Sequence, residues 1–211
     1  MYTILFYIAL FTGILPLLLV FKRKRAFDKN HSIVPFLWLT GMATFYEFIG
    51  SVVLKINTFY WFQLYPLLSF LALYYFFFYL LESNHKKLFR ILFILFSITY
   101  SISFFFCSDD DRFISSAINR SAITVFVFIS TLLWLKNLFE KMDVPNLWQN
   151  DTFYFIAGLI IYYASTILLF LSTIFIYNSD LYFYDFWLVN IIATLILRVL
   201  LSIGVWKMKQ S

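Results

Sequence analysis

Long apolar runs fill most of this sequence, and only short charged breaks separate them. Crossing the roughly 30 Å of hydrocarbon in a bilayer takes about 20 apolar residues in a helix. The runs match that length, and they predict seven helices near residues 2–21, 33–54, 58–81, 88–107, 119–138, 152–176 and 182–206. We therefore expect an all-α fold, a polytopic transmembrane helical bundle that takes up residues 1–211 as a single domain.

Composition supports the same fold class. Hydrophobic residues make up 63% of the chain and charged residues only 13%, which is outside the usual range of water-soluble domains. The first run, from Tyr2 to Phe21, has no basic stretch before it and is followed directly by Lys22, Arg23, Lys24 and Arg25. A cleaved signal peptide has the opposite charge order, so we expect this run to be retained as the first helix.

Basic residues are unevenly distributed over the breaks. One set of alternate breaks carries Lys22, Arg23, Lys24, Arg25, Lys29, Lys86, Lys87, Arg90, Lys136, Lys141, Lys207 and Lys209. The other set carries only Lys55, Arg112 and Arg120. Because cytoplasmic loops are enriched in lysine and arginine, we expect the N-terminus outside and the C-terminus in the cytoplasm. The net charge of +5 is then explained by topology and lipid headgroups, without nucleic acid as a partner.

Two segments show a short internal similarity. Phe36–Phe48 reads FLWLTGMATFYEF and Phe153–Ser165 reads FYFIAGLIIYYAS, so that Gly41 aligns with Gly158 and Tyr46 with Tyr163. The match fits a 3+1+3 arrangement of parallel repeats, which some transporters use. Chance similarity in a sequence built from few residue types is the alternative.

Two charged residues lie well inside the predicted spans. A charge near mid-bilayer costs about 2.5–3.5 kcal/mol on insertion scales, so such residues face the bundle interior and mark functional sites. Glu47 and Arg198 are separated in depth by roughly 8 Å at 1.5 Å of rise per residue. We expect the two side chains to meet, directly or through a water, if their helices are neighbours.

Polar residues at spacings of three and four lie along one face of three helices. The three sets are Thr40, Thr44, Glu47 and Ser51; Gly158, Tyr162, Ser165 and Ser172; and Asn190, Thr194, Arg198 and Ser202. Gln63, near Pro66, lies at a similar depth. These patterns predict an intramembrane ligand site formed by Glu47, Gln63, Tyr162, Asn190, Thr194 and Arg198. The alternative is that the serine and threonine hydroxyls only join helices to one another.

Catalytic and metal-binding chemistry finds little support in the sequence. Cys107 is the only cysteine, and His31 and His85 fall in breaks among lysines. The acidic run Asp109–Asp111 is typical of a solvated loop. No recognised nucleophile, zinc or phosphate-loop motif is present, so we expect no enzyme activity, no cofactor and no metal.

The segments FYFIAGLIIYYAS, from Phe153 to Ser165, and FWLVNIIATLILRVLLSIGVWK, from Phe186 to Lys207, resemble the last two helices of uncharacterised small seven-helix integral membrane proteins of Bacteroidota. The resemblance covers about the last third of the chain. It implies a multi-pass protein of a bacterial inner membrane, in contact with membrane lipids and with signalling neighbours.

Three functions stay open at this point. We expect a sensor or receptor-like protein that binds a small or lipidic ligand and signals through a separate protein partner at residues 136–151. The first alternative is a small-solute or proton-coupled transporter, although only five glycines and four prolines are available to break helices, as transporters often require. The second alternative is a membrane-embedded accessory subunit of a larger complex.

Overall fold

The computed structural model describes residues 2–22, 31–55, 59–81, 85–106, 112–141, 146–177 and 183–208, and all its elements are helical. Seven helical segments are present in these ranges, because α1 and α2 form one interrupted span and the π-helix η1 continues α3. The bounds are α1 Tyr2–Thr12, α2 Leu15–Lys22, α3 Val34–Tyr46, η1 Glu47–Val53, α4 Phe59–Leu81, α5 Lys86–Ser103, η2 Phe104–Phe106, α6 Arg112–Lys141, η3 Leu147–Gln149, α7 Asp151–Tyr177 and α8 Phe183–Lys207.

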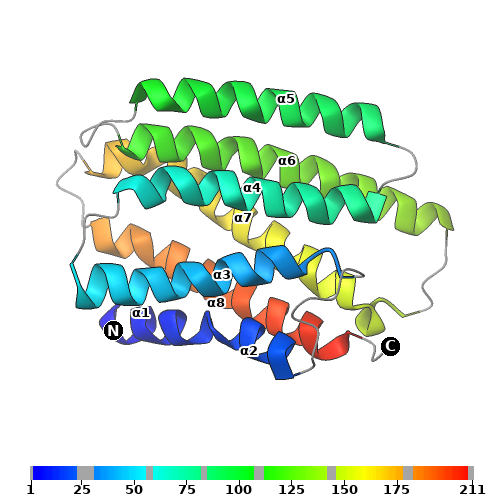
Figure 1. Cartoon of the computed structure of the whole chain (residues 1–211), viewed down its shortest axis with the longest axis horizontal. Helices are drawn as coiled ribbons and strands as arrows, with labels where there is room; N and C mark the ends of the chain where they lie inside the picture. Colours follow the sequence, from blue (N-terminus) through cyan, green and yellow to red (C-terminus); the bar gives the residue numbers. More distant parts are fainter. Residues whose placement is uncertain are drawn as a thin grey trace.

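By their contacts, six of the seven segments form a closed ring, and Figure 1 shows the helices lying roughly side by side. Going around it, α3 packs on α4, α4 on α6, α6 on α7, α7 on α8, α8 on α1 and α2, and α2 back on α3. The α5 helix lies outside the ring, against α6 and α4. The ring therefore has an interior that six segments share and that α5 does not reach.

Aromatic packing attaches α5 to the ring. The ring of Phe70 on α4 stacks on that of Phe96 on α5, with centroids 3.6 Å apart, and meets Phe126 of α6 edge-on at 5.1 Å. All three side chains are buried. Burying a phenylalanine contributes about 1.5–3 kcal/mol in a soluble core, but lipid is itself apolar, so here the close fit of the rings matters more than their removal from solvent.

The most extensive helix contact is between α7 and α8, and glycines allow it. A Cβ on Gly204 of α8 would lie 2.7 Å from Cδ1 of Phe155 on α7, and a Cβ on Gly158 of α7 would lie 3.1 Å from Cβ of Leu200. Small residues at membrane helix contacts let backbones approach closely in this way. The aligned glycines of the proposed repeat have different neighbours, since Gly41 meets Leu17 of the first span; the repeat stays a prediction.

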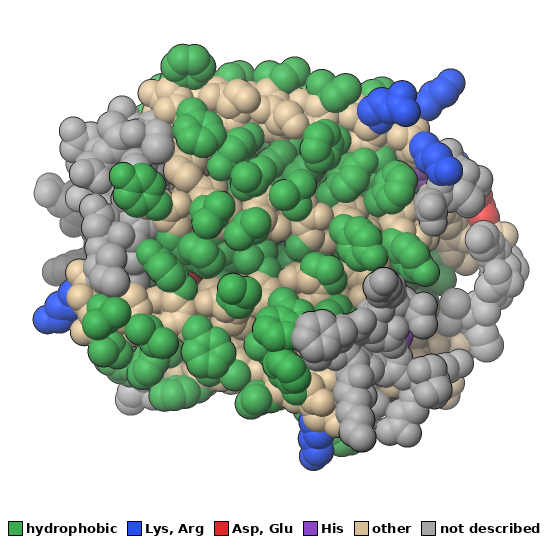
Figure 2. Space-filling view, viewed as in Figure 1, with side chains coloured by type: hydrophobic (Ala, Val, Ile, Leu, Met, Phe, Trp, Pro, Cys, Tyr) green, Lys and Arg blue, Asp and Glu red, His purple; other side chains and the backbone are tan. Residues whose placement is uncertain are grey.

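Within the part of the chain that the structure describes, six helices are long and apolar enough to cross a membrane, as in a multi-pass membrane protein. They cover Leu5–Lys22, Gln63–Leu81, Lys86–Phe106, Ile114–Glu140, Asp151–Ser172 and Phe186–Lys207. Hydrophobic side chains cover much of the face of the bundle seen in Figure 2, and single side chains such as Leu168 are 72% exposed. The segment formed by α3 and η1 lies in the ring beside these helices, and its role as a seventh span stays a prediction.

Two of the predicted boundaries were wrong. The first span is not continuous, because α1 ends at Thr12 and α2 begins at Leu15. The fifth predicted helix begins at Arg112, seven residues before the expected 119, and continues to Lys141. Its early turns include Ser115 and Asn119, which are fully buried because they bond to α4, as described below. Charge and polarity in this stretch had indicated a loop.

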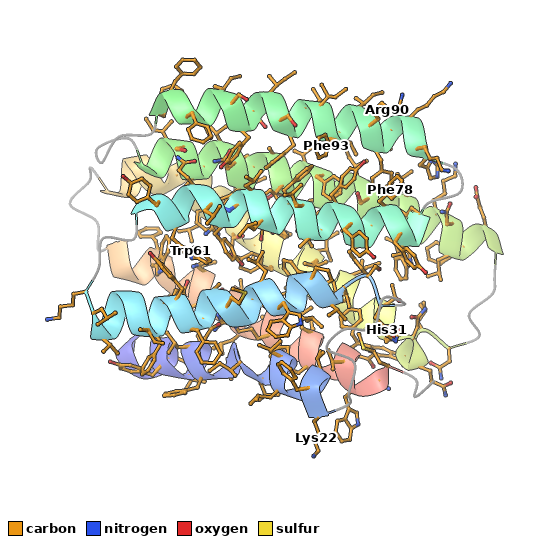
Figure 3. All side chains as sticks on the ribbon, viewed as in Figure 1. Lys22, His31, Trp61, Phe78, Arg90 and Phe93 are labelled. Carbon is orange, nitrogen blue, oxygen red and sulfur yellow. The ribbon has the colours of Figure 1, made fainter. Side chains whose placement is uncertain are left out.

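Most of the basic residues whose side chains the structure describes lie at one end of the bundle. Lys22 and Arg90 lie at the end opposite the N-terminus (Figure 3), where α2 ends and α5 begins. Lys86, Lys87, Lys136 and Lys207 belong to the same end by the direction of their helices. Lys55 is at the other end. The charge asymmetry expected from the sequence thus corresponds to two ends of one structure.

Gly204→Ala tests the α7–α8 contact. The added methyl group would push into the ring of Phe155, and overpacking of this kind costs about 1–3 kcal/mol, so we expect a lower melting temperature in detergent. Gly50→Ala is the matched control, because a Cβ there would lie 3.8 Å from the nearest atoms of the Tyr46 ring. Equal melting temperatures for the two variants would contradict this packing.

Candidate intramembrane binding site

A cavity of about 310 Å³ lies inside the ring of helices. Among the described residues, its wall comes from α1, α3, η1, α4, α6, α7 and α8, and α5 does not contribute. We call it the central cavity. Its charged members are Glu47, Arg120 and Arg198, and its polar and aromatic members are Thr40, Tyr46, Trp61, Tyr65, Ser69, Tyr162, Tyr163, Trp187, Asn190 and Thr194.

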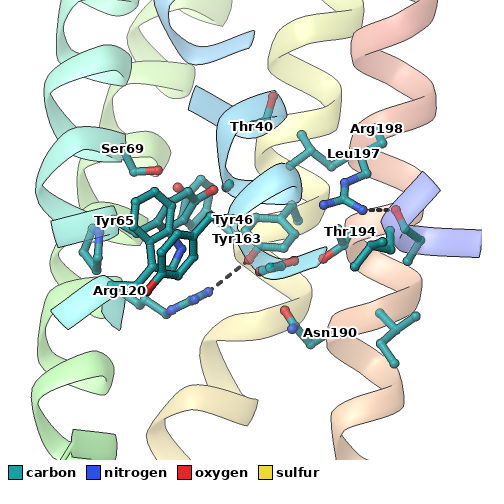
Figure 4. A pocket seen from close by; sticks show the side chains of 18 of the residues that line it. Thr40, Tyr46, Tyr65, Ser69, Arg120, Tyr163, Asn190, Thr194, Leu197 and Arg198 are labelled. Carbon is teal, nitrogen blue, oxygen red and sulfur yellow. Dashed lines mark hydrogen bonds between the residues drawn. The ribbon is translucent and has the colours of Figure 1, made fainter. Parts of the chain in front are cut away.

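Arg198 on α8 is buried and bonded to two other segments (Figure 4). Its Nη1 donates to the backbone carbonyl of Ala9 on α1, and its Nη2 donates to Oγ1 of Thr44 on α3 at 3.2 Å. The guanidinium is planar and has five donors, so it reaches two acceptors at once. Arg198 therefore connects the helical segments α8, α1 and α3.

The Ala9 carbonyl is available because the first span breaks just after it. Pro16 has no backbone N–H, and its ring clashes with the carbonyl four residues earlier, so a helix does not run unbroken into it. The amide of Gly13 donates to Leu10 at 3.2 Å and not to Ala9, as an α-helix would require. The freed carbonyl accepts from Thr12 Oγ1 at 2.9 Å and from Arg198.

Gly13 leaves room for the guanidinium. A Cβ at this position would lie 2.7 Å from Cζ of Arg198 and would also collide with Oγ1 of Thr44. Only a residue without a side chain lets the arginine lie against the backbone here. Gly13 and Pro16 thus break the helix. The small number of glycines and prolines in the sequence had counted against a transporter with broken helices.

Arg120 was placed outside the membrane by the sequence pattern, and this was wrong. It lies in the third turn of α6 and lines the central cavity. Its Nη1 donates to the hydroxyl of Tyr162 at 3.0 Å, and its Cζ lies 3.9 Å above the ring of Phe170. A cation over an aromatic face is stabilised when water is excluded. The four-residue spacing from Ser116 through Arg120 to Thr124 was the signal that could have indicated a helical position.

Glu47 stands at the junction of α3 and η1 and lines the central cavity. Its side chain is exposed in the isolated chain, and among the described residues it makes no hydrogen bond or ion pair. The charges of Arg198 and, more weakly, Arg120 act on the carboxylate. Glu47 and Arg198 thus line one cavity without a direct bond among the described residues, and the guanidinium is bonded to Ala9 and Thr44 instead.

The backbone widens where Glu47 begins. Residues Glu47–Val53 form a π-helix, and the amide of Leu54 donates to Ile49 at 2.8 Å, five residues back. Such segments are rare and occur frequently at functional sites. Of the polar stripe predicted from Thr40 to Ser51, Thr40 and Glu47 line the central cavity, and the Ser51 side chain is outside the described ones.

Five of the six predicted site residues line the central cavity: Glu47, Tyr162, Asn190, Thr194 and Arg198. Gln63 does not. Its Nε2 donates to Ser115 Oγ, and its Oε1 accepts from Asn119 at 3.4 Å, so it joins α4 to α6. Ser165 is exposed, away from the cavity.

Tyr65, Ser69 and Tyr163 belong to the site and were missed by the sequence analysis. Tyr65 and Ser69 lie one turn apart on α4, and Tyr163 follows Tyr162 on α7 (Figure 4). The buried atoms Ser69 Oγ, Arg120 Nε and Asn190 Oδ1 find no hydrogen-bond partner among the described residues. A buried polar atom without a partner costs about 1–3 kcal/mol, so the wall is suited to water or a polar ligand.

The described residues include no group of three His, Cys, Asp or Glu side chains that could hold a metal ion. His31 and His85 lie at the basic end of the bundle, before α3 and α5, and Cys107 and Asp109–Asp111 are outside the described residues.

No protein-family model, curated protein or solved structure matches the chain. The function is therefore argued from the chemistry of the central cavity.

Arg198→Lys tests the junction of the three helical segments. Lysine keeps the charge but is a single point donor, so one of the two bonds, to Ala9 or to Thr44, is lost, and a hydrogen bond from a charged group contributes about 1.5–3 kcal/mol. We expect a lower melting temperature in detergent. Arg90→Lys, at an exposed site, is the matched control and should melt like the wild type. A tolerated Arg198→Lys would mean that the two bonds contribute little.

Proposed function

We propose that this protein is a sensor or receptor-like membrane protein that binds a small or lipidic ligand in the central cavity and signals through a separate partner. The observation that carries the proposal is the wall of the cavity. It combines two guanidinium groups, one carboxylate and several unpartnered polar atoms with aromatic rings, inside a volume of about 310 Å³. Small-molecule sites are typically apolar cavities of about 300–1,000 Å³ with a few placed polar groups.

The orientation that we propose puts the N-terminus outside, in a bacterial inner membrane. The basic end of the bundle supports it, because lysine and arginine gather on the cytoplasmic side. Trp61 and Trp187 of the cavity wall lie within the first turns of α4 and α8, at the end opposite the basic residues. The ligand would then enter from outside or from the outer leaflet.

The signal would leave at the basic end, toward a cytoplasmic or membrane partner at residues 136–151. In this stretch α6 runs through Lys136 to Lys141, and Trp148 in η3 is 67% exposed. The carbonyl of Trp148 accepts from the hydroxyl of Tyr154 at 3.1 Å, so η3 is fixed to α7. An exposed tryptophan on a fixed turn is suited to a partner or to the membrane surface.

Transport of a small solute is the second candidate function. It is favoured by the interrupted first span and by the π-helix at Glu47, because transporters commonly form substrate sites at broken helices. Both irregular segments adjoin the central cavity. A role as an accessory subunit has no comparable observation behind it.

A thermal-shift screen tests the proposed function. A ligand that binds the native state raises its melting temperature by mass action, so we expect at least one lipid or small metabolite to stabilise the detergent-purified protein. The shift should be lost in Glu47→Gln and in Arg198→Gln. Flux of the same compound into proteoliposomes would indicate transport, and binding without flux would indicate a sensor. If no compound acts and both variants merely melt earlier, ligand binding is contradicted.

A further inference from the structure

The three charged side chains of the central cavity differ in what already satisfies them. Arg198 donates to the carbonyl of Ala9 and to Thr44, and Arg120 donates to Tyr162 and lies over Phe170. Glu47 has no hydrogen-bond or ion-pair partner among the described residues, and its side chain is accessible. The carboxylate is thus the charge that is most open to a ligand.

Aromatic rings line the same cavity as this carboxylate. The ring of Tyr46, the next residue in the chain, stacks on that of Trp61 at 4.5 Å, and Trp61 meets Tyr65 at 5.7 Å. All three line the central cavity with Glu47. A carboxylate beside tyrosine and tryptophan faces is the usual surrounding of an organic ammonium group, since cation–π attraction adds to the ion pair. This side of the cavity is suited to a cation.

Positive charges line the same cavity. Arg120 comes from α6 and Arg198 from α8 (Figure 4). The described wall therefore holds two positive charges and one negative charge. A ligand that is only a cation would be repelled by both guanidinium groups, and one that is only an anion would face the open carboxylate of Glu47. In a ligand that carries both charges, each charge can lie beside a group of opposite sign in the wall.

We infer that the ligand of the central cavity is a small amphipathic zwitterion. Its ammonium group lies beside Glu47, Tyr46 and Trp61, and its acidic group lies toward Arg120, with Arg198 adding to the positive field. Its apolar part packs in the deeper, hydrophobic part of the wall, against Ile123 and Leu197. The inference rests on the proposed function, because it names the ligand class of that same cavity.

Two sources have this chemistry: a free amino acid with an apolar side chain, and a choline phosphate headgroup. A cavity of about 310 Å³ is at the lower end of the range for small-molecule sites. It fits either group and does not fit a whole phospholipid. The two sources are separated by the choice of probes.

The experiment uses the full chain in lipid nanodiscs and isothermal titration calorimetry. One series is L-leucine, its methyl ester, which is only a cation, and N-acetyl-L-leucine, which is only an anion. The other series is glycerophosphocholine, choline, which is only a cation, and dimethyl phosphate, which is only an anion. We expect one zwitterion to bind at least about tenfold more tightly than both of its singly charged analogues, a difference of about 1.4 kcal/mol. The series in which this occurs identifies the source.

Variants assign the two charges of the ligand. Glu47→Gln should lower the affinity for the zwitterion to that of the anionic analogue, and Arg120→Gln should lower it to that of the cationic analogue. Glu140→Gln and Lys136→Gln are matched controls, because these side chains are 63% exposed and form an ion pair of 3.7 Å away from the cavity. The controls should bind like the wild type.

The analogue series on the wild type decides the inference even if a variant fails to fold. If a singly charged analogue binds the wild type as tightly as the zwitterion, the zwitterion is excluded, while the proposed binding function stands. If no compound of either series binds, the inference is overturned, and the wider thermal-shift screen decides separately whether the cavity binds any ligand.

Discussion

The hydrogen bond from Arg198 to the carbonyl of Ala9 is the contact on which the central cavity depends. A helix broken inside hydrocarbon leaves backbone groups without partners, and such backbone is tolerated only where protein or water satisfies it. Here a buried guanidinium satisfies it from the last helix and also holds Thr44 of α3. A buried guanidinium and an unpaired carbonyl each cost free energy in lipid, and here the guanidinium donates a hydrogen bond to the carbonyl. Three helical segments are joined as a result.

The sequence predicted much of this arrangement because the bilayer restricts the choices. The apolar runs located the helices, and the cost of intramembrane charge selected Glu47 and Arg198 as members of an interior site. Periodicity added Tyr162, Asn190 and Thr194, which line the same cavity. Gln63 was included for its depth, and depth does not say which neighbour a side chain meets. Periodicity failed for Ser165, because a spacing of four places residues on one face without saying what that face meets.

The remaining features depend on contacts that a single sequence does not contain. Arg120 followed the acidic run at Asp109–Asp111 and was assigned to a loop by its charge; Tyr162 and Phe170 of α7, which stabilise it inside the bundle, are about 40 residues or more away in the chain. Gly13 was not recognised as a space for Arg198, since only the fold brings α8 against it. The π-helix at Glu47 has no local proline to indicate it, and it became visible only through its hydrogen bonds.

The position of the irregular segments bears on how an occupied cavity would act on the rest of the protein. The break after α1 and the π-helix are the two places in the ring where the regular helical hydrogen bonds are replaced, and both adjoin charged residues of the cavity wall. A ligand charge beside Glu47 changes the field at Arg198, whose two bonds hold the broken span. Such a change requires no new contact at a distance, because one side chain already joins the cavity to α1 and α3. Under the proposed function, the residues that bind the ligand are therefore also the residues that would transmit its binding to α1 and α3.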